Sequence, residues 1–196
     1  MELLQPNCFY HIYNHSNGRE SIFLSKENYH FFLRRYRKFI PVIACTYSYC
    51  LMPNHFHFLI KTKNANELSA AFPKPKVIEK VLSKQFSNLF SSYTQAFNKQ
   101  QHRMGSLFIK NFKRKKVEDK DYLLRLTCYI HKNPVHHGFC NSPIKWPYSS
   151  FKPILKKQFT FPEQREVLDW FGGLENFKNL HAHKTDWSGL WKDTTR

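Results

Sequence analysis

The sequence predicts an α+β fold in which helices cover a four-stranded antiparallel sheet and a helical tail follows. Four segments are rich in β-branched and aromatic residues, and three longer segments repeat apolar residues at helical spacing. With 196 residues, of which 41% are hydrophobic and 17% aromatic, the chain can bury a core. This composition excludes a disordered protein.

The first four predicted elements are a strand, a helix and a pair of strands. Residues 8–15 are rich in β-formers and are followed by a turn signal, so they predict the first strand. Residues 25–39 begin with a serine that can cap a helix and then carry apolar side chains at helical spacing. Residues 42–51 and 55–61 are two further β-rich runs with Pro53 between them, which is typical of a β-hairpin.

A loop, a long helix, a strand and a last helix complete the predicted domain. Residues 64–76 are polar and contain two prolines, so we expect a loop there. One apolar stripe runs along residues 77–98 and predicts a long helix. Residues 106–117 fit a fourth strand that ends in a run of cations. The acidic start of residues 118–133 favours a helix, which Pro134 is expected to limit, although a proline can also kink a helix that continues.

The pattern of residues along the chain changes after Gly138, and two short helices are expected at 162–171 and 174–183. The first six elements of the preceding β-α-β-β-α-β-α order match the ferredoxin-like split βαβ arrangement, which RRM-like proteins share. We therefore predict a basic domain over 1–151 and a C-terminal helical appendage over 152–196.

The net charge indicates a polyanionic partner. Lys and Arg number 31 against 14 Asp and Glu, which gives a formal charge of +17, and the excess is concentrated before residue 117. Such a distribution favours nucleic acid as the partner, before a membrane. The alternative is a soluble basic protein without such a partner.

The cysteines and the apolar runs indicate a cytoplasmic protein. There are five cysteines, an odd number without a C-x-x-C pair, which fits neither a disulfide framework nor a cysteine zinc site. No stretch approaches the apolar length of a membrane span, and no signal peptide is recognisable at the start.

Two short patterns carry candidate chemistry. His55 and His57 are two apart on a predicted strand, so both imidazoles project to one side and resemble half of a metal site. The alternative is a pair of surface or hydrogen-bonded histidines. Tyr129 and Asn133 are four apart on the last predicted helix and share one of its faces. The alternative for Tyr129 is core packing, because Tyr122 precedes it at the spacing of a core stripe.

Four segments together resemble the HUH-type single-tyrosine transposases, and most closely the REP-associated tyrosine transposases. They are MPNHFHFLIK, GSLFIKNFKRKKV, YLLRLTCYIHKNPVHHG and WPYSSF, and the resemblance runs from about Tyr10 to Phe151. The resemblance implies that Tyr129 is a catalytic nucleophile. It also implies a divalent cation, Mg²⁺ or Mn²⁺, bound by His55, His57 and Asn133. His131, His136 and His137 crowd the motif, and one of them could substitute as a ligand.

The implied activity is metal-dependent cleavage and rejoining of single-stranded DNA beside hairpins. Family members form a 5′-phosphotyrosine intermediate, and the leaving group is a 3′-hydroxyl. Two sets of residues are candidates for DNA binding. The first set, in the loop region after the first strand, is Asn14, Asn17 and Arg19. The second set is the cationic run Lys113, Arg114, Lys115 and Lys116, which could also be a solvated strand end.

Two other functions remain open on the sequence alone. A non-catalytic nucleic-acid-binding module on an RRM-like fold would have no use for paired histidines that face a tyrosine. A metal-dependent phosphodiesterase that uses water would leave no covalent adduct. The position of Tyr129 relative to the two imidazoles separates the transposase from the binding module.

Overall fold

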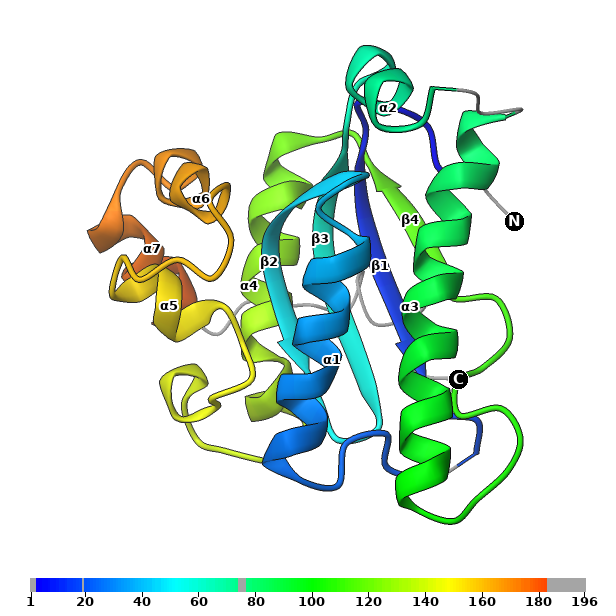
Figure 1. The fold of residues 1–196 in the computed structure, drawn as a ribbon. Helices are drawn as coiled ribbons and strands as arrows, with labels where there is room; N and C mark the ends of the chain where they lie inside the picture. The colour runs from blue at the N-terminus through cyan, green and yellow to red at the C-terminus, as the bar shows by residue number, and fades with distance from the viewer. Residues whose placement is uncertain (1–2, 19, 74–76, 183–196) are drawn as a thin grey trace.

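The computed structural model describes residues 3–18, 20–73 and 77–182. Its centre is a sheet of four strands in the order β2-β3-β1-β4, and each neighbouring pair is antiparallel. This is the predicted ferredoxin-like arrangement, and the α+β prediction is confirmed (Figure 1). The strands are β1 (Phe9–His15), β2 (Ala44–Leu51), β3 (His55–Thr62) and β4 (Lys113–Val117).

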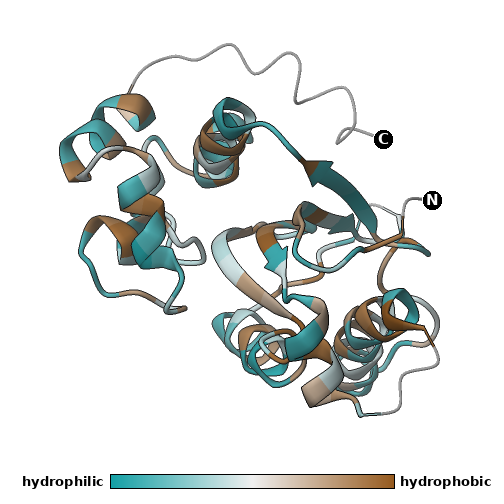
Figure 2. Ribbon diagram, turned by 90° about the horizontal axis from the view of Figure 1, so that it is seen from above, coloured by the Kyte–Doolittle hydropathy of each residue, from teal (hydrophilic) through white to brown (hydrophobic). Residues whose placement is uncertain are grey.

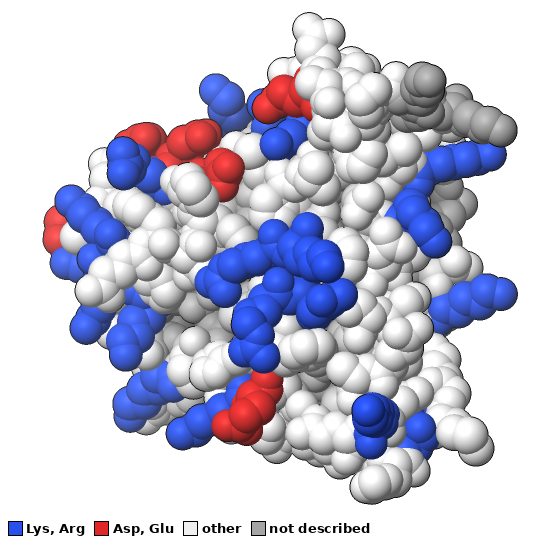
Figure 3. Space-filling view, in the orientation of Figure 1, with Lys and Arg blue, Asp and Glu red and all other residues white. Residues whose placement is uncertain are grey.

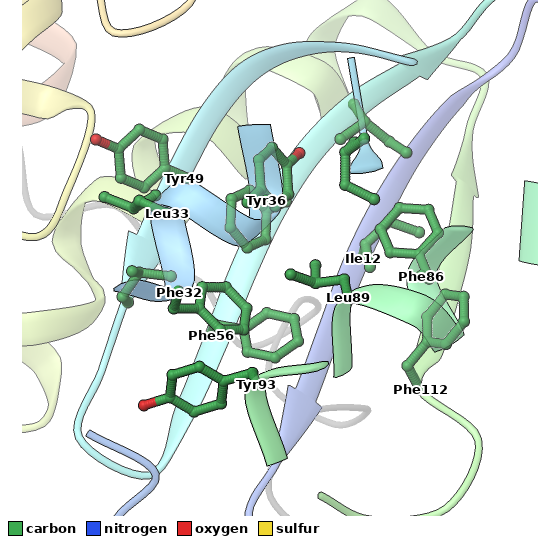
Figure 4. Packing of buried hydrophobic residues seen from close by; sticks show 14 of the residues in the cluster. Ile12, Phe32, Leu33, Tyr36, Tyr49, Phe56, Phe86, Leu89, Tyr93 and Phe112 are labelled. Atoms are coloured by element: carbon green, nitrogen blue, oxygen red, sulfur yellow. The ribbon is translucent and has the colours of Figure 1, made fainter. Parts of the chain in front are cut away.

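One face of the sheet is covered by α1 (Lys26–Phe39) and α3 (Ile78–Gln100), which pack side by side. Phe56 and Phe58 of β3 point into this layer, and the Phe58 ring stacks on Tyr36 of α1 at 4.2 Å between centroids. Figure 4 shows this core, to which both helices and the sheet contribute aromatic rings. Alternation along β3 therefore leaves its histidines on the opposite face.

The opposite face of the sheet is covered by α4 (Lys120–His136). The helix begins where predicted, because the Asp119 carboxylate accepts hydrogen bonds from the backbone N–H groups of Asp121 and Tyr122. It does not end near residue 133, since it continues through Pro134 to His136. A proline in the last turn costs one backbone hydrogen bond, and this loss does not stop the helix here.

The residues after α4 pack against its outer side and against β2 (Figure 1). They form a short 3₁₀ turn and three helices, whose buried side chains join α4 in a second apolar cluster. The domain boundary predicted at residue 151 therefore lies within a packed region. The elements are η1 (Pro143–Lys145), α5 (Phe151–Leu155), α6 (Gln164–Trp170) and α7 (Leu174–Ala182).

Two predicted elements differ in the structure. The expected loop at 64–76 contains a helix, α2 (Ala65–Ala71), because Asn64 and Glu67 cap each other's backbone N–H groups. The fourth strand occupies only the last part of 106–117. Before it, Phe108 makes an isolated bridge to Ser16, and Asn111 has a positive φ of 65° that interrupts an extended chain.

Charge and hydropathy are distributed unevenly over the elements. On the face seen in Figure 3, Lys and Arg gather over α1, whereas acidic side chains gather near α6. Figure 2 shows that the edge strand β4 is hydrophilic over most of its length. Within the part of the chain that the structure describes, no helix is both long enough and apolar enough to cross a membrane.

Candidate active site between the sheet and α4

The predicted catalytic side chains meet between β3 and α4. His55 and His57 project from β3 toward α4, on the face opposite to the large aromatic core. Tyr129 and Asn133 lie one helical turn apart on α4 and face the sheet. The expected geometry, with both imidazoles turned toward the helix that carries Tyr129, is therefore confirmed.

His55 is held at both ring nitrogens. Its Nε2 lies 2.9 Å from Asn133 Oδ1, and its Nδ1 lies 2.8 Å from Oδ1 of the preceding residue, Asn54. The ring also stacks on His15 at 4.8 Å between centroids and meets the edge of His137 at 5.0 Å. These contacts fix the plane of the imidazole, so its Nε2 is directed toward α4.

His57 is held at one ring nitrogen. Its Nδ1 lies 2.9 Å from Nε2 of His11 on β1. Its Nε2 is buried and has no hydrogen-bond partner among the described residues. The Tyr129 ring stands nearly perpendicular to the imidazole, at 5.4 Å between centroids and an interplanar angle of 77°. Tyr129 also approaches His11, at 6.3 Å between centroids.

Burial determines the charge state of the site. The exposed fractions of His57 and Tyr129 are 1%, that of Asn133 is 0% and that of His55 is 3%. Desolvation lowers the pKa of His55 to about 3 and that of His57 well below its usual range. Both imidazoles are therefore neutral at pH 7, which is the form that binds a metal ion.

The candidate ligands for a cation at this site are two imidazoles and one amide. Among the residues that the structure describes, no three His, Cys, Asp or Glu side chains are arranged to hold a metal ion. A cation here would therefore need the amide of Asn133 beside the two imidazoles. The Nδ2 atom of Asn133 is also buried without a hydrogen-bond partner among the described residues.

One of the two tautomers of His55 fits a cation at this site. Each ring nitrogen of His55 faces an amide oxygen, which only accepts, and the neutral ring has a single proton to donate. With the proton on Nδ1, the lone pair of Nε2 faces Asn133 Oδ1 at 2.9 Å, and a cation between them could bind both atoms. Turning the Asn133 amide would instead present Nδ2 as a donor, which is the arrangement expected without a cation.

One of the other histidines near the motif points away from this site. His131 is buried on the outer side of α4, where its Nε2 lies 2.8 Å from Ser150 Oγ and its Nδ1 lies 2.9 Å from His181 Nε2 of α7. It therefore joins α4 to the tail and is not placed to bind a metal ion beside His55. His137, by contrast, approaches the His55 ring.

The cationic run on β4 divides between the two faces of the sheet. Lys113 and Lys115 pair with Tyr13 and His11, so they lie on the face of the candidate site. In agreement, the Lys115 ammonium nitrogen lies over the Tyr122 ring of α4, 5.3 Å from the ring centroid.

Arg114 and Lys116 lie on the other face. Arg114 donates to Ser83 of α3 at 3.0 Å and covers the Phe112 ring at 4.1 Å. Lys116 forms an ion pair with Glu118 at 2.9 Å. The alternation of the strand therefore places only half of the run beside the histidines.

The DNA-binding residues predicted in the loop after the first strand are dispersed, and Asn14 lies within β1 and not in that loop. Asn14 is buried on the α3 side, where its Nδ2 donates to the backbone oxygen of Ile109 at 3.1 Å. This contact holds the segment before β4. Asn17 is exposed, and its backbone N–H donates to Leu107. Arg19 lies outside the described residues.

Two residues beside the histidines were missed by the sequence reasoning, namely His11 and Asn54. A signal for His11 was present, because His11, Tyr13 and His15 alternate along the first predicted strand and must share one face. Asn54 directly precedes the paired histidines, but a residue in a turn gives no periodicity from which to infer where its side chain points.

Comparisons with known proteins agree with the motifs. No family model matches the chain. A Haemophilus influenzae protein assigned by name to the REP-associated tyrosine transposases is 29% identical over 129 residues, which are 65% of this chain and 66%, just under two thirds, of that protein. A solved structure of a REP-associated tyrosine transposase bound to a REP hairpin superposes with a TM-score of 0.60 at 14% identity, over 81% of this chain and 85% of the other. The chain is therefore similar to REP-associated tyrosine transposases in both sequence and fold.

Proposed function

We propose that the protein is a DNA strand transferase that cleaves and rejoins single-stranded DNA through a covalent bond to Tyr129. The observation that carries the proposal is the meeting of Tyr129 and Asn133, one turn apart on α4, with His57 and His55 on β3. A nucleic-acid-binding module has no need for this buried combination of a phenol, an amide and two neutral imidazoles. The similarity to REP-associated tyrosine transposases supports the same class of activity.

The proposed reaction is a transesterification. The Tyr129 oxygen attacks the phosphorus of the scissile phosphodiester and loses its proton, while the bond from phosphorus to the 3′ oxygen breaks. The departing oxygen takes up a proton and leaves as a 3′-hydroxyl, and the DNA stays joined to Tyr129 through its 5′-phosphate. One phosphoester bond replaces another, so the reverse reaction can join strands without ATP.

The residues beside Tyr129 would hold a divalent cation. His55, His57 and Asn133 offer two imidazole nitrogens and one amide oxygen, and these three side chains lie together beside Tyr129. When bound, such a cation polarises a phosphate and offsets the charge that develops during attack. His55 and Asn133 would also orient the phosphate, because Asn133 lies one turn beyond Tyr129 on the same rigid helix.

Substrate must reach a buried site. Tyr129, His57 and Asn133 are each at most 1% exposed, so binding of a DNA phosphate requires the surrounding groups to move. Lys113 and Lys115 lie on the same face of the sheet as the candidate site and could attract the DNA backbone toward it. Because the related solved structure is bound to a REP hairpin, we propose a single strand that carries a hairpin as the substrate.

The decisive experiment is capture of the covalent intermediate. The protein is incubated with Mn²⁺ and single-stranded DNA that contains an imperfect hairpin and carries a label at its 3′ end, and SDS gels reveal a protein–DNA band. Wild-type protein should give the band, and chelation of the metal should remove it. Tyr129→Phe should give no band and no cleavage, because the ring remains while the attacking oxygen is lost.

Tyr122→Phe is the matched control. This residue lies two turns earlier on α4, and its variant should keep full activity. Activity in the Tyr129→Phe protein would contradict the proposed nucleophile. Cleavage without any covalent band would favour a phosphodiesterase that uses water, and binding without cleavage would favour a nucleic-acid-binding module.

A further inference from the structure

We propose that His11 is a positioning residue, which holds His57 in the tautomer that presents Nε2 to the metal site. This inference rests on the proposed function, since it assigns the atom through which His57 would bind the cation. His11 does not itself touch the reacting atoms. Its role would be to set the proton and the ring orientation of its neighbour.

The sheet fixes the two rings against each other. Tyr13 of β1 lies directly opposite His57 of β3, and His11 is the next residue along β1 on the same face. This diagonal position brings His11 Nε2 to 2.9 Å from His57 Nδ1, with the rings nearly parallel at 5.1 Å between centroids. Both side chains are buried, at 3% and 1% exposure, so water does not compete for the contact.

Proton counting gives the direction of this hydrogen bond. One of the two nitrogens must donate, and the geometry alone permits either. If His11 donated, the proton of neutral His57 would lie on Nε2, where a buried N–H would have no acceptor among the described residues. If His57 Nδ1–H donates, Nε2 keeps a lone pair that a cation can use. The second arrangement places the His11 proton on Nδ1 and leaves no unpaired donor on the buried His57 ring.

His55 has the same arrangement with a different partner. Its Nδ1 is held by Asn54 Oδ1 at 2.8 Å, which leaves its Nε2 toward Asn133. Both histidines of the pair therefore have Nδ1 engaged on the side away from the site. This agreement between two independent partners is the reason to assign Nε2 as the binding atom in both rings.

Loss of the His11 acceptor should weaken metal binding. A neutral imidazole without a partner at Nδ1 favours the Nε2–H tautomer, which has no lone pair at the binding position. Residues that orient metal ligands typically contribute about 10–100-fold to metal affinity. We expect a decrease of this size in Mn²⁺ affinity for His11→Phe, which keeps a ring to stack on Tyr13. His11→Gln restores an acceptor oxygen and should recover part of the affinity.

The first measurement needs no variant of His11. Long-range ¹H–¹⁵N spectra of metal-free protein with ¹⁵N-labelled histidine report the tautomer of each ring, and His57→Ala identifies the His57 signals. Wild-type His57 should carry its proton on Nδ1. A proton on Nε2 would overturn the proposal, whether or not any His11 variant folds.

The second measurement compares Mn²⁺ affinities by calorimetry on metal-free, DNA-free protein. The expected order is wild type, then His11→Gln, then His11→Phe, with His57→Ala weakest. If His57→Ala loses Mn²⁺ binding while His11→Phe keeps it, the role of His11 is wrong and the metal site stands. If wild-type protein binds no Mn²⁺, or if His55→Ala and His57→Ala bind it unchanged, the metal site itself is wrong.

Discussion

The two imidazoles on β3 are neutral because they are buried, and neutral imidazoles together with an amide oxygen form a comparatively soft ligand set. His55 and His57 have pKa values lowered by desolvation, and Asn133 carries no charge at any pH. Such a set suits Mn²⁺ better than Mg²⁺, which prefers carboxylate and water oxygens. The proposed site should therefore support cleavage at lower Mn²⁺ than Mg²⁺ concentrations.

Replacing both imidazoles should separate cleavage from binding. The His55→Ala, His57→Ala protein should lose all detectable metal-dependent cleavage, because the cation would lose two of its three protein ligands. Its affinity for DNA should stay within a few-fold of wild type, since phosphate contacts by Lys and Arg dominate binding. Gel assays for cleavage and fluorescence anisotropy for binding test both parts, with circular dichroism as a check of folding. Undiminished cleavage in EDTA would refute the metal requirement.

At the level of elements, β4 uses the two-residue repeat of a strand to place its cations on two different surfaces. Lys113 and Lys115 lie on the side of the candidate site, whereas Arg114 and Lys116 contact Ser83 and Glu118. A run of four cations therefore does not act as one patch.

The Lys113→Ala, Lys115→Ala protein should bind single-stranded DNA more weakly and with a smaller salt dependence. Each lost phosphate contact lowers the slope of log K against log salt by about 0.7, so we expect a decrease of about 1.4. Arg114→Ala, on the other face, should leave the slope close to that of wild type. Binding titrations at several salt concentrations provide the slopes, and equal slopes for all three proteins would contradict the assignment.

The packing of α7 indicates that the tail is part of the folded unit. Phe177 is fully buried between α4 and α5, with its ring 5.5 Å from that of Phe151 and 4.2 Å from that of His181. Phe177→Ala should lower the free energy of unfolding by about 3–5 kcal/mol, because a large cavity remains. Leu180→Ala on the same helix, at an exposed position, should cost much less. Urea unfolding measures both, and equal small effects would support a loosely attached appendage.

Across the whole molecule, buried histidines link stability to pH. Burial lowers the pKa of His11 and His55 to about 3 and that of His181 to about 4, and it lowers those of His57 and His131 as well. In the unfolded chain these groups titrate near pH 6.5. Between these values the unfolded state binds more protons than the folded state, so acid favours unfolding.

Stability should therefore be greatest above pH 6.5 and should decrease as the pH falls toward 4. Each buried histidine steepens the decrease by up to about 1.4 kcal/mol per pH unit. Urea unfolding of metal-free protein at pH 7.5, 6 and 5 measures the slope. A free energy of unfolding that stays constant over this range would mean that the histidines are not buried in the neutral form.

The sequence was sufficient where a residue's environment follows from its place in a periodic element. Alternation along residues 55–61 predicted that two histidines share a face, and in the structure the two phenylalanines between and after them take the other. Helical spacing predicted that Tyr129 and Asn133 face the same way. The sequence was less reliable where local contacts determine the secondary structure. At 64–76, Asn64 and Glu67 cap a helix inside a segment whose composition is typical of a loop.

By itself, the sequence determined the strand and helix order, the ferredoxin-like sheet and the resemblance to tyrosine transposases, because hydrophobic periodicity and motif spacing are properties of the chain alone. Only the tertiary structure decided which groups meet. It placed His11 on β1 against His57 on β3, two residues that are 46 positions apart in sequence. It buried Asn14 and turned Arg114 toward α3, so these predicted DNA contacts are engaged within the protein. Contacts between distant segments depend on strand register and helix packing, which are set by the burial of the whole core and leave no local signal at any one residue.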